Sequence, residues 1–163
     1  MIGESNPAAM PKLRNRRGEK ARRDIVNSTI RILNQNGYGA TSIDAVMADC
    51  NLGRGSILNQ FPNRHALMIA TGETAMRQMV ATATRKVVKI DGPELQVRSL
   101  FDVFWETHNL PEAIALTEIL LASRWDRVLA DGLSQPAERM ETVIDELHAG
   151  LAKQVGIRKW KEL

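Results

Sequence analysis

Residues 41–67 read TSIDAVMADCNLGRGSILNQFPNRHAL, and this stretch predicts two short helices joined by a tight turn. Thr41 is expected to cap the first helix, with Asp44 in its first turn, because this arrangement satisfies free amides and suits the helix dipole. Residues 51–53, Asn-Leu-Gly, permit a left-handed turn around one apolar side chain. Pro62 blocks continuation of the second helix. The outline is that of a helix-turn-helix.

The second short helix, residues 54–60, has an apolar side and a polar side. Ile57 and Phe61 lie four residues apart, so both are predicted to be buried. The remaining side chains face outward and are hydrogen-bonding, uncharged or cationic. An α-helix fits the major groove of DNA, where such side chains reach base edges.

Five residues of this helix are candidates for DNA contact. Arg54 can form two hydrogen bonds to guanine, and Asn59 or Gln60 can pair with adenine. Ser56 and the backbone of Gly55 suit phosphate, because a missing side chain permits close approach. The alternative is an ordinary solvated helix face.

This region resembles the DNA-binding domain of the TetR family of bacterial transcriptional regulators. There a basic first helix ending in Gly-aromatic-x-x-Thr precedes a Gly-x-Leu-Tyr-x-His-Phe-x-x-Lys segment. The match runs without gaps over residues 23–67, at Gly37, Tyr38, Thr41, Val46, Leu52, Gly55, Ile57, Phe61, Arg64 and Leu67. The resemblance implies a double-stranded DNA operator, a homodimer and a small-molecule effector. It also places Thr41 and Arg64 among the candidate DNA-contacting residues.

Within residues 51–60 the sequence departs from the family pattern at four positions, and Arg64 is a fifth, conservative difference. Leu58 stands where the family has a tyrosine that touches phosphate, and Gln60 replaces a histidine. Gly53 replaces a serine or threonine cap, and Asn51 replaces a glycine. Arg64 replaces a lysine, and it is expected to contact phosphate, to bind carbonyls at the end of the recognition helix, or to remain an exposed charge. These changes affect the expected affinity and operator preference, not the fold.

Composition predicts an all-α protein. The 163 residues suffice for one domain or two small helical units, and no run of alternating β-branched residues suggests strands. Charge is uneven: residues 1–64 hold ten Lys or Arg against five Asp or Glu, a net +5, whereas residues 65–163 hold twelve against fourteen, a net −2. A cationic front suits a protein that docks one end on phosphates.

The predicted architecture is a three-helix head joined by a long helix to a helical bundle. Residues 1–18 are expected to form a disordered basic arm, which either reaches DNA or solubilises the chain. Residues 19–63 form the helix-turn-helix domain, whose first helix spans residues 19–36. Residues 64–163 form a ligand-binding and dimerisation domain.

Four helices are expected in this rear domain. A linking helix spans residues 64–90, and the next begins at Pro93 with an apolar stripe at Val97, Leu100, Phe101, Phe104, Trp105 and His108. Residues 113–129 predict a central buried helix that ends at Asp131-Gly132. A last helix, capped by Ser134, carries a stripe at residues 140–155 that either covers the core or meets a second copy.

The resemblance implies a small-molecule cavity between the rear helices. The candidate lining residues are Met76, Met79, Phe101, Phe104, Trp105, His108 and Trp125. His108 could supply a polar contact to a ligand. The alternative is plain hydrophobic core with a satisfied histidine.

Several function classes are not expected. One cysteine, Cys50, excludes an intramolecular disulfide and a multi-cysteine zinc site. Glu141, Asp145 and His148 share a helix face, but this spacing is typical of solvated surface, so we expect no metal. Phosphate-loop and nucleophile motifs are absent from the sequence, which predicts neither an enzyme nor a cofactor. With no signal peptide or membrane-spanning stretch, we expect a cytoplasmic protein.

These observations predict a DNA-binding transcriptional regulator, a ligand-responsive repressor that binds a palindromic operator as a homodimer. The alternative is a helical sensor or interaction protein of the same fold with weak or no specific DNA binding.

Overall fold

The computed structural model describes residues 10–157, with side chains from Arg16 onward, and within this range every regular element is a helix. The helices are α1 (Met10–Ala40), α2 (Ile43–Cys50), α3 (Arg54–Gln60), α4 (Arg64–Val88), α5 (Pro93–His108), α6 (Pro111–Ser123) and α7 (Arg127–Gln154). The predicted all-α fold is therefore confirmed. The part of the predicted arm before Met10 lies outside the described residues.

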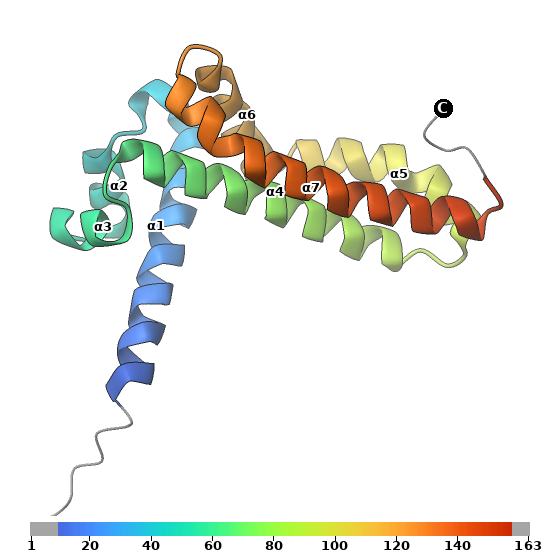
Figure 1. Ribbon diagram of the computed structural model, residues 1–163, viewed down its shortest axis with the longest axis horizontal. Coiled ribbons are helices and arrows are strands. Elements are labelled where there is room, and N and C mark those ends of the chain that lie inside the picture. The colour runs from blue at the N-terminus through green and yellow to red at the C-terminus, as the bar shows by residue number, and fades with distance from the viewer. Residues whose placement is uncertain (1–9, 158–163) are drawn as a thin grey trace, which may run out of the picture.

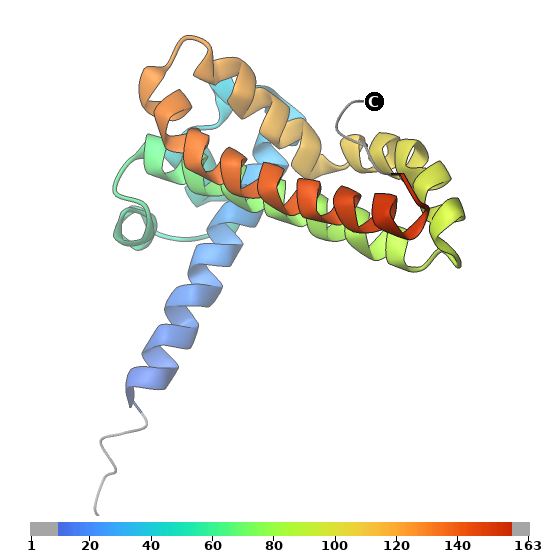
Figure 2. The ribbon, with the colours of Figure 1, turned by 45° about the vertical axis from the view of Figure 1, so that its right-hand side comes forward.

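Helix α1 begins earlier than the sequence suggested. Residues 10–18 are helical, so the prediction of a disordered arm is wrong for this part. They are rich in strong helix formers, and Pro11 is tolerated because it lies in the first turn. Figures 1 and 2 show this end of α1 projecting from the body of the molecule. The other end breaks as predicted at Gly37, whose φ of 77° is left-handed.

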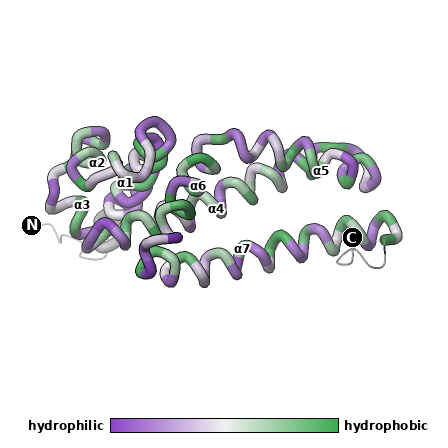
Figure 3. The backbone as a smooth tube through the Cα atoms, turned by 90° about the horizontal axis from the view of Figure 1, so that it is seen from above, coloured by the Kyte–Doolittle hydropathy of each residue, from purple (hydrophilic) through white to green (hydrophobic). Residues whose placement is uncertain are grey.

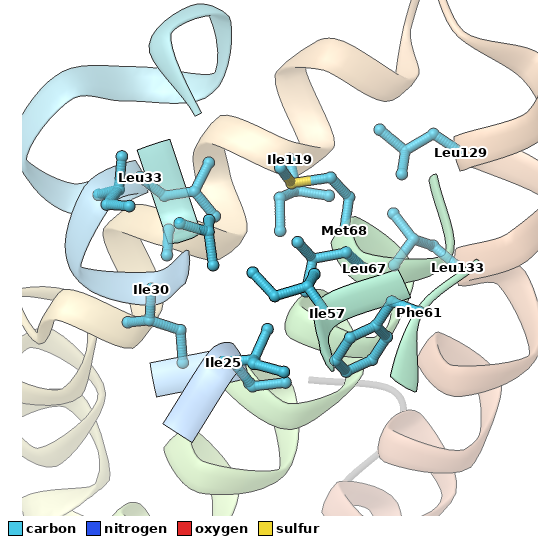
Figure 4. Packing of buried hydrophobic residues seen from close by; sticks show 14 of the residues in the cluster. Ile25, Ile30, Leu33, Ile57, Phe61, Leu67, Met68, Ile119, Leu129 and Leu133 are labelled. Carbon is cyan, nitrogen blue, oxygen red and sulfur yellow. The ribbon is translucent and has the colours of Figure 1, made fainter. Parts of the chain in front are cut away.

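The head is held together by a hydrophobic core that all of its helices share. Apolar side chains of α1, α2, α3 and the first turns of α4 meet there, and Ile119 of α6 and Leu129 and Leu133 of α7 belong to the same cluster (Figure 4). The largest fully buried members include Ile25, Leu33, Val46, Ile57, Phe61, Leu67 and Met68. Burial of side chains this large contributes roughly 1.5–3 kcal/mol each. The core therefore sets the angles between the head helices.

Helix α4 is one long helix, as predicted, and it extends from the head core to the part of the bundle formed with α5 and α7. Asn63 caps it, its side-chain oxygen accepting a hydrogen bond from the Ala66 amide at 2.9 Å. Helix α7 runs alongside most of α4, and α5 lies beside the distal part of α4, away from the head (Figures 1 and 3). A second small core joins these three helices through Val87, Val103 and Leu151. The rear domain is thus an extension built on α4.

The boundary between α6 and α7 differs from the prediction. Helix α6 ends at Ser123, and Asp126 caps α7 by accepting a hydrogen bond from the Leu129 amide at 3.1 Å. Helix α7 then continues through Gly132 and Pro136, so the predicted stop at Asp131-Gly132 and the predicted cap at Ser134 are wrong. Gly132 serves tertiary packing instead, because a Cβ there would lie 2.2 Å from Cδ1 of Ile69 on α4.

Helix α6 is buried on one side only. Ala113, Ala115 and Ile119 are buried against α1 and α4, whereas Leu120 and Leu121 are exposed. The prediction of a helix buried on nearly every side is therefore wrong for α6. Its buried side connects the rear domain directly to the head.

No helix within residues 10–157 combines the length and the apolar character needed to cross a lipid bilayer.

Candidate functional site

The exposed face of α3 is presented by a short, well-anchored helix. Ile57 and Phe61 are buried, as predicted, and Leu52 in the preceding turn packs against the same core. Asn51 takes the left-handed conformation with φ of 52°, while Gly53 caps α3 from an extended conformation. The turn thus needs one left-handed residue, not two.

The five candidate residues of α3 lie largely in solvent. Arg54, Ser56 and Asn59 are exposed, and Gln60 is half-buried. A Cβ added to Gly55 would meet nothing within 4 Å, so its backbone is open to a close approach. This face offers hydrogen-bonding groups and one cation, the combination suited to base edges and phosphates.

Arg54 is paired in the free protein. Its Nη1 atom lies 2.8 Å from Oδ1 of Asp44, which belongs to the first turn of α2. The two side chains are 59% and 75% exposed, so solvent screens the ion pair and its contribution to stability is small. The pair nevertheless fixes where the guanidinium lies. Sequence reasoning treated Asp44 only as a helix-dipole partner and missed this contact.

Thr41 does not belong to the exposed surface, which corrects two predictions. It is fully buried, and its Oγ1 donates a hydrogen bond to the Gly37 carbonyl at 2.8 Å. Ser42 caps α2 instead, because its hydroxyl accepts a hydrogen bond from the Ala45 amide at 3.1 Å. The side chain of Thr41 therefore cannot reach DNA from this position.

Arg64 has a structural partner that the sequence did not predict. Its Nε donates to the Thr41 carbonyl at 2.9 Å and its Nη2 to the Tyr38 carbonyl at 2.6 Å. Its guanidinium carbon also lies 4.0 Å from the centre of the Tyr38 ring. Arg64 thus ties the start of α4 to the chain between α1 and α2. It neither contacts the end of α3 nor remains a free surface charge.

Arg22 of α1 fills the place expected for Arg64. Its Nη1 donates to the carbonyl of Gln60, the last residue of α3, at 3.1 Å, and its guanidinium carbon lies 4.3 Å from the centre of the Phe61 ring. A cation at a helix C-terminus is favourable because the helix dipole is negative there. Arg16, Arg17, Lys20 and Arg23 are exposed on the same part of α1.

Asp49 locks α2 against α1. Its Oδ2 accepts a hydrogen bond from the Ser28 hydroxyl and an ion-paired hydrogen bond from Arg31. These two hydrogen bonds, with the positive charge of Arg31, hold the pKa of Asp49 below its usual value, although partial burial opposes them. The angle of the helix-turn-helix relative to α1 is thus set by polar contacts as well as by the core.

The rear domain contains an apolar cavity of about 530 Å³ between α4, α5 and α7. Five of the seven candidate residues line it: Met76, Met79, Phe101, Phe104 and His108. Trp105 and Trp125 do not, and their exposed fractions are 64% and 88%.

The buried side of α5 differs from the predicted stripe. Val103 and Thr107 are its buried residues, while Phe101, Phe104 and Trp105 are exposed to solvent. The stripe predicted an apolar partner for the whole face, as a cavity lining or as core, but periodicity alone does not say which part of an apolar face has a partner. Helix α7 adds four cavity residues: Met140, Ile144 and Leu147, from the stripe expected to cover the core or meet a second copy, and His148, expected on a solvated face.

Two polar contacts tie helices α6 and α7 to the end of α1 and the start of α4. The backbone amide of Tyr38, just after the break in α1, donates to Oε2 of Glu118 on α6 at 2.8 Å. His65, in the first turn of α4, donates through Nε2 to Oδ2 of Asp126 at 2.7 Å. The hydrogen bond from His65, supported by the Leu129 amide, lowers the pKa of Asp126. Leu116 on α6 lines the cavity, so this helix touches both the cavity and the head.

Within residues 10–157, no group of three or more His, Cys, Asp or Glu side chains is arranged to hold a metal ion. Cys50 is a free thiol that packs against the head core.

The buried head, the exposed face of α3 and the attached bundle define the chain as a helix-turn-helix DNA-binding protein. A family model described as "Bacterial regulatory proteins, tetR family" matches residues 25–71, which span the last part of α1 through the first turns of α4. This match supports the predicted resemblance to the TetR family for the helix-turn-helix domain, and the relatives support a DNA-binding transcriptional regulator.

Relatives along the rest of the chain are distant. The HTH-type transcriptional regulator CymR of Pseudomonas putida is 20% identical over 135 residues, which cover 83% of this chain and 66% of CymR. The HTH-type transcriptional regulator BetI of Burkholderia mallei is 22% identical over 146 residues, covering 89% and 71%. The chain thus spans about two thirds of the length of these curated relatives.

A solved structure has a similar fold. The multidrug binding protein EbrR, crystallised in complex with imidazole, matches with a TM-score of 0.58 and 22% identity, over 73% of this chain and 64% of EbrR.

Proposed function

We propose that this regulator is a ligand-responsive repressor that binds a palindromic operator as a homodimer. The observation that carries the proposal is the exposed face of α3, where Arg54, Ser56 and Asn59 project from a helix anchored by Ile57 and Phe61. In a two-fold dimer, two such helices enter successive major grooves, about ten base pairs apart. The relatives are named as transcriptional regulators, a role that needs no catalysis. The proposed compartment is the cytoplasm, where a bacterial operator lies.

The cavity supports the ligand-responsive part of the proposal. Leu116 lines it, and two residues further along the same helix Glu118 holds the Tyr38 amide of the head. A ligand that shifts α6 therefore alters the contact that positions the end of α1. Release of DNA requires only that the ligand bind the released state more tightly than the DNA-bound state.

Salt-dependent DNA binding tests the proposal. We expect the affinity for the selected operator to fall by about a thousandfold between 50 and 200 mM salt, with a preference over unrelated duplex at each concentration. Fluorescence anisotropy with a labelled operator and a scrambled duplex measures both. Binding that ignores sequence and changes little with salt contradicts the repressor.

A sensor or interaction protein that binds DNA weakly is the second candidate. It is favoured by Leu58, an exposed apolar residue on α3 where the family has a phosphate-contacting tyrosine, and by the pairing of Arg54 with Asp44. In that case Leu58→Tyr would create tight binding where the natural chain has none. If the natural chain already binds its operator at nanomolar concentration, this candidate fails.

A further inference from the structure

We infer that the cavity between α4, α5 and α7 selects molecules with an apolar body and one acidic O–H group, a phenol or a carboxylic acid, and rejects cations. The inference rests on the proposed function, in which this cavity holds the effector. It adds the chemical class of the ligand and assigns His108 as the residue that receives the O–H group.

The first argument for the ligand class is that the cavity lining contains no acidic or strongly basic side chain. The side chains around the cavity include methionine, phenylalanine, leucine, threonine and histidine, and none of them is Asp, Glu, Lys or Arg. The cavity is partly open to solvent at Phe101 and Phe104, so a cation that enters it would give up part of its hydration without gaining a carboxylate partner, which is costly. The cavity therefore disfavours permanently charged amines.

The two threonines of the lining are already occupied. Thr84 donates its hydroxyl hydrogen to the Val80 carbonyl at 2.8 Å. The Thr107 hydroxyl lies 2.9 Å from the carbonyls of both Val103 and Phe104. Because both hydroxyls bond to their own helices, the polar selectivity of the cavity falls to its histidines.

One ring nitrogen of His108 is hydrogen-bonded within α5, and the other is the candidate ligand contact. Its Nδ1 lies 2.8 Å from the Phe104 carbonyl, and because a carbonyl only accepts, Nδ1 must carry a hydrogen. In the neutral ring Nε2 is then the acceptor, and the hydrogen bonds described for residues 16–157 include none that is donated to it. The ring is held in place by Phe104, with centroids 3.8 Å apart. His108 thus presents a fixed acceptor to an O–H donor.

The proton balance differs between the two ligand groups. A phenol keeps its hydrogen and donates it to Nε2. A carboxylic acid is ionised in water near pH 7, so it binds as a carboxylate together with one proton taken up from solvent; the proton on Nε2 gives an imidazolium beside the carboxylate, and the pair adds no net charge to the cavity. Both arrangements satisfy the acceptor, whereas a hydrocarbon leaves it without a donor. The second histidine, His148, already has an interaction within the chain, and the inference does not require it to be free.

The apolar body of the ligand is less tightly specified. Met76, Met79 and Met140 lie around the cavity with Phe101 and Phe104. Methionine side chains adapt their shape and make favourable contacts with aromatic rings. A volume of about 530 Å³ suits a compact ring system. We therefore expect one aromatic skeleton to be accepted with several substituents, provided that it carries the O–H group.

Four probes built on one skeleton test the inference: 2-naphthol, 2-naphthoic acid, naphthalene and 2-naphthyltrimethylammonium. Isothermal titration of the full chain should give affinities for the naphthol and the acid about tenfold above that for naphthalene, with the ammonium weakest. In His108→Phe, which keeps an aromatic ring but loses the acceptor, the naphthol should fall to the level of naphthalene. Circular dichroism checks that the variant is folded.

The outcomes separate the inference from the proposed function. If the ammonium binds as tightly as the naphthol, the ligand class is wrong while the cavity remains a binding site. If His148→Phe removes the naphthol preference and His108→Phe does not, the assignment of His108 is wrong. If none of the four probes binds at millimolar concentration, both the inference and the effector part of the proposed function are overturned.

Discussion

We expect Arg54 to contribute most to recognition of the DNA sequence. In the free protein its side chain is held by an ion pair with Asp44. The two groups are 2.8 Å apart and mostly exposed. A carboxylate so close to the proposed DNA-binding face would also repel phosphate. We therefore expect Asp44 to lower general affinity for DNA while it orients the guanidinium.

Replacing Asp44 with Asn should separate these two effects. We predict that Asp44→Asn binds random duplex about two- to fivefold more tightly and discriminates its operator less, because surface ion pairs contribute up to about 1 kcal/mol. Anisotropy titrations with operator and random duplex measure both quantities. Asp131→Asn is the matched control, because Asp131 is 74% exposed and paired with Arg127 in the rear domain. Unchanged discrimination in Asp44→Asn would show that Asp44 does not orient Arg54.

The lowered pKa of Asp49 leads to a prediction of how the stability of the fold changes at low pH. Its folded-state pKa lies below the unfolded value, so its stabilisation is present above the unfolded pKa and is lost as the pH falls through the folded pKa. Asp49→Asn should therefore lower the melting temperature at pH 7, and the difference from the natural chain should shrink below about pH 4. Thermal denaturation across this range measures the effect. Asp102→Asn, on the exposed side of α5, is the control. A difference that stays constant with pH contradicts this account.

At the level of elements, glycines in α4 and α7 allow the two helices to approach closely. A Cβ at Gly132 would collide with Ile69, and one at Gly72 would lie 2.8 Å from Cδ2 of the buried Leu133. Gly150, also in α7, has nothing within 4 Å of the same position. The chain therefore offers both a crowded and an open helical glycine in one element.

Alanine substitutions at these two glycines should have opposite effects. We predict that Gly132→Ala destabilises the fold by about 1–3 kcal/mol, because Ile69 must move. Gly150→Ala should stabilise it by about 0.5–1 kcal/mol, because alanine favours the helix and meets no neighbour. Urea denaturation gives both free energies of unfolding. Equal effects of the two substitutions would mean that Gly132 does not mediate the contact.

The same glycine explains where sequence reasoning succeeded and failed. Local signals predicted the head well: the break at Gly37, the cap at Asn63 and the buried pair Ile57 and Phe61 all lie where expected. In the rear domain, Asp131-Gly132 looked like a helix stop, but the glycine is required by a tertiary contact with Ile69. A glycine that ends a helix and a glycine that permits close helix packing cannot be told apart from the sequence alone.

Some predictions about individual site residues were wrong for a related reason. Thr41 and Ser42 are adjacent hydroxyl residues, and either can cap a helix, so only the fold decides that Thr41 is buried and Ser42 caps. The stripe on α7 was recognised, but its partners were not. Leu147 turns to the cavity and Leu151 to the small rear core, because α7 lies against both α4 and α5. Periodicity identifies the apolar face of a helix but does not say which element packs against it.

At the scale of the whole molecule, the proposed dimer requires a surface that this chain does not itself cover. Val143 lies on the α7 stripe, is exposed and does not line the cavity. Val88, at the end of α4, is exposed as well but lies outside the stripe. Substituting these two valines with the same charged residue therefore distinguishes an interface on α7 from a general effect of surface charge.

We predict that the chain sediments as a dimer at micromolar concentration and that Val143→Arg shifts it towards the monomer, because a buried, unpaired charge is costly. Val88→Arg should leave the dimer intact. Analytical ultracentrifugation measures both variants. A monomeric natural chain would remove the dimer from the proposal, and a dimer that persists in Val143→Arg would remove this part of α7 from the interface.

The central claim is that α3 reads DNA sequence, and selection from randomised duplexes tests it most directly. Bound fragments from the natural chain and from the double variant Arg54→Ala, Asn59→Ala are sequenced under the same salt conditions. We predict that the natural chain enriches a palindrome with half-sites about ten base pairs apart and that the double variant loses this preference while it retains general binding. Enrichment of the same palindrome by both proteins, or of none by the natural chain, would contradict the account.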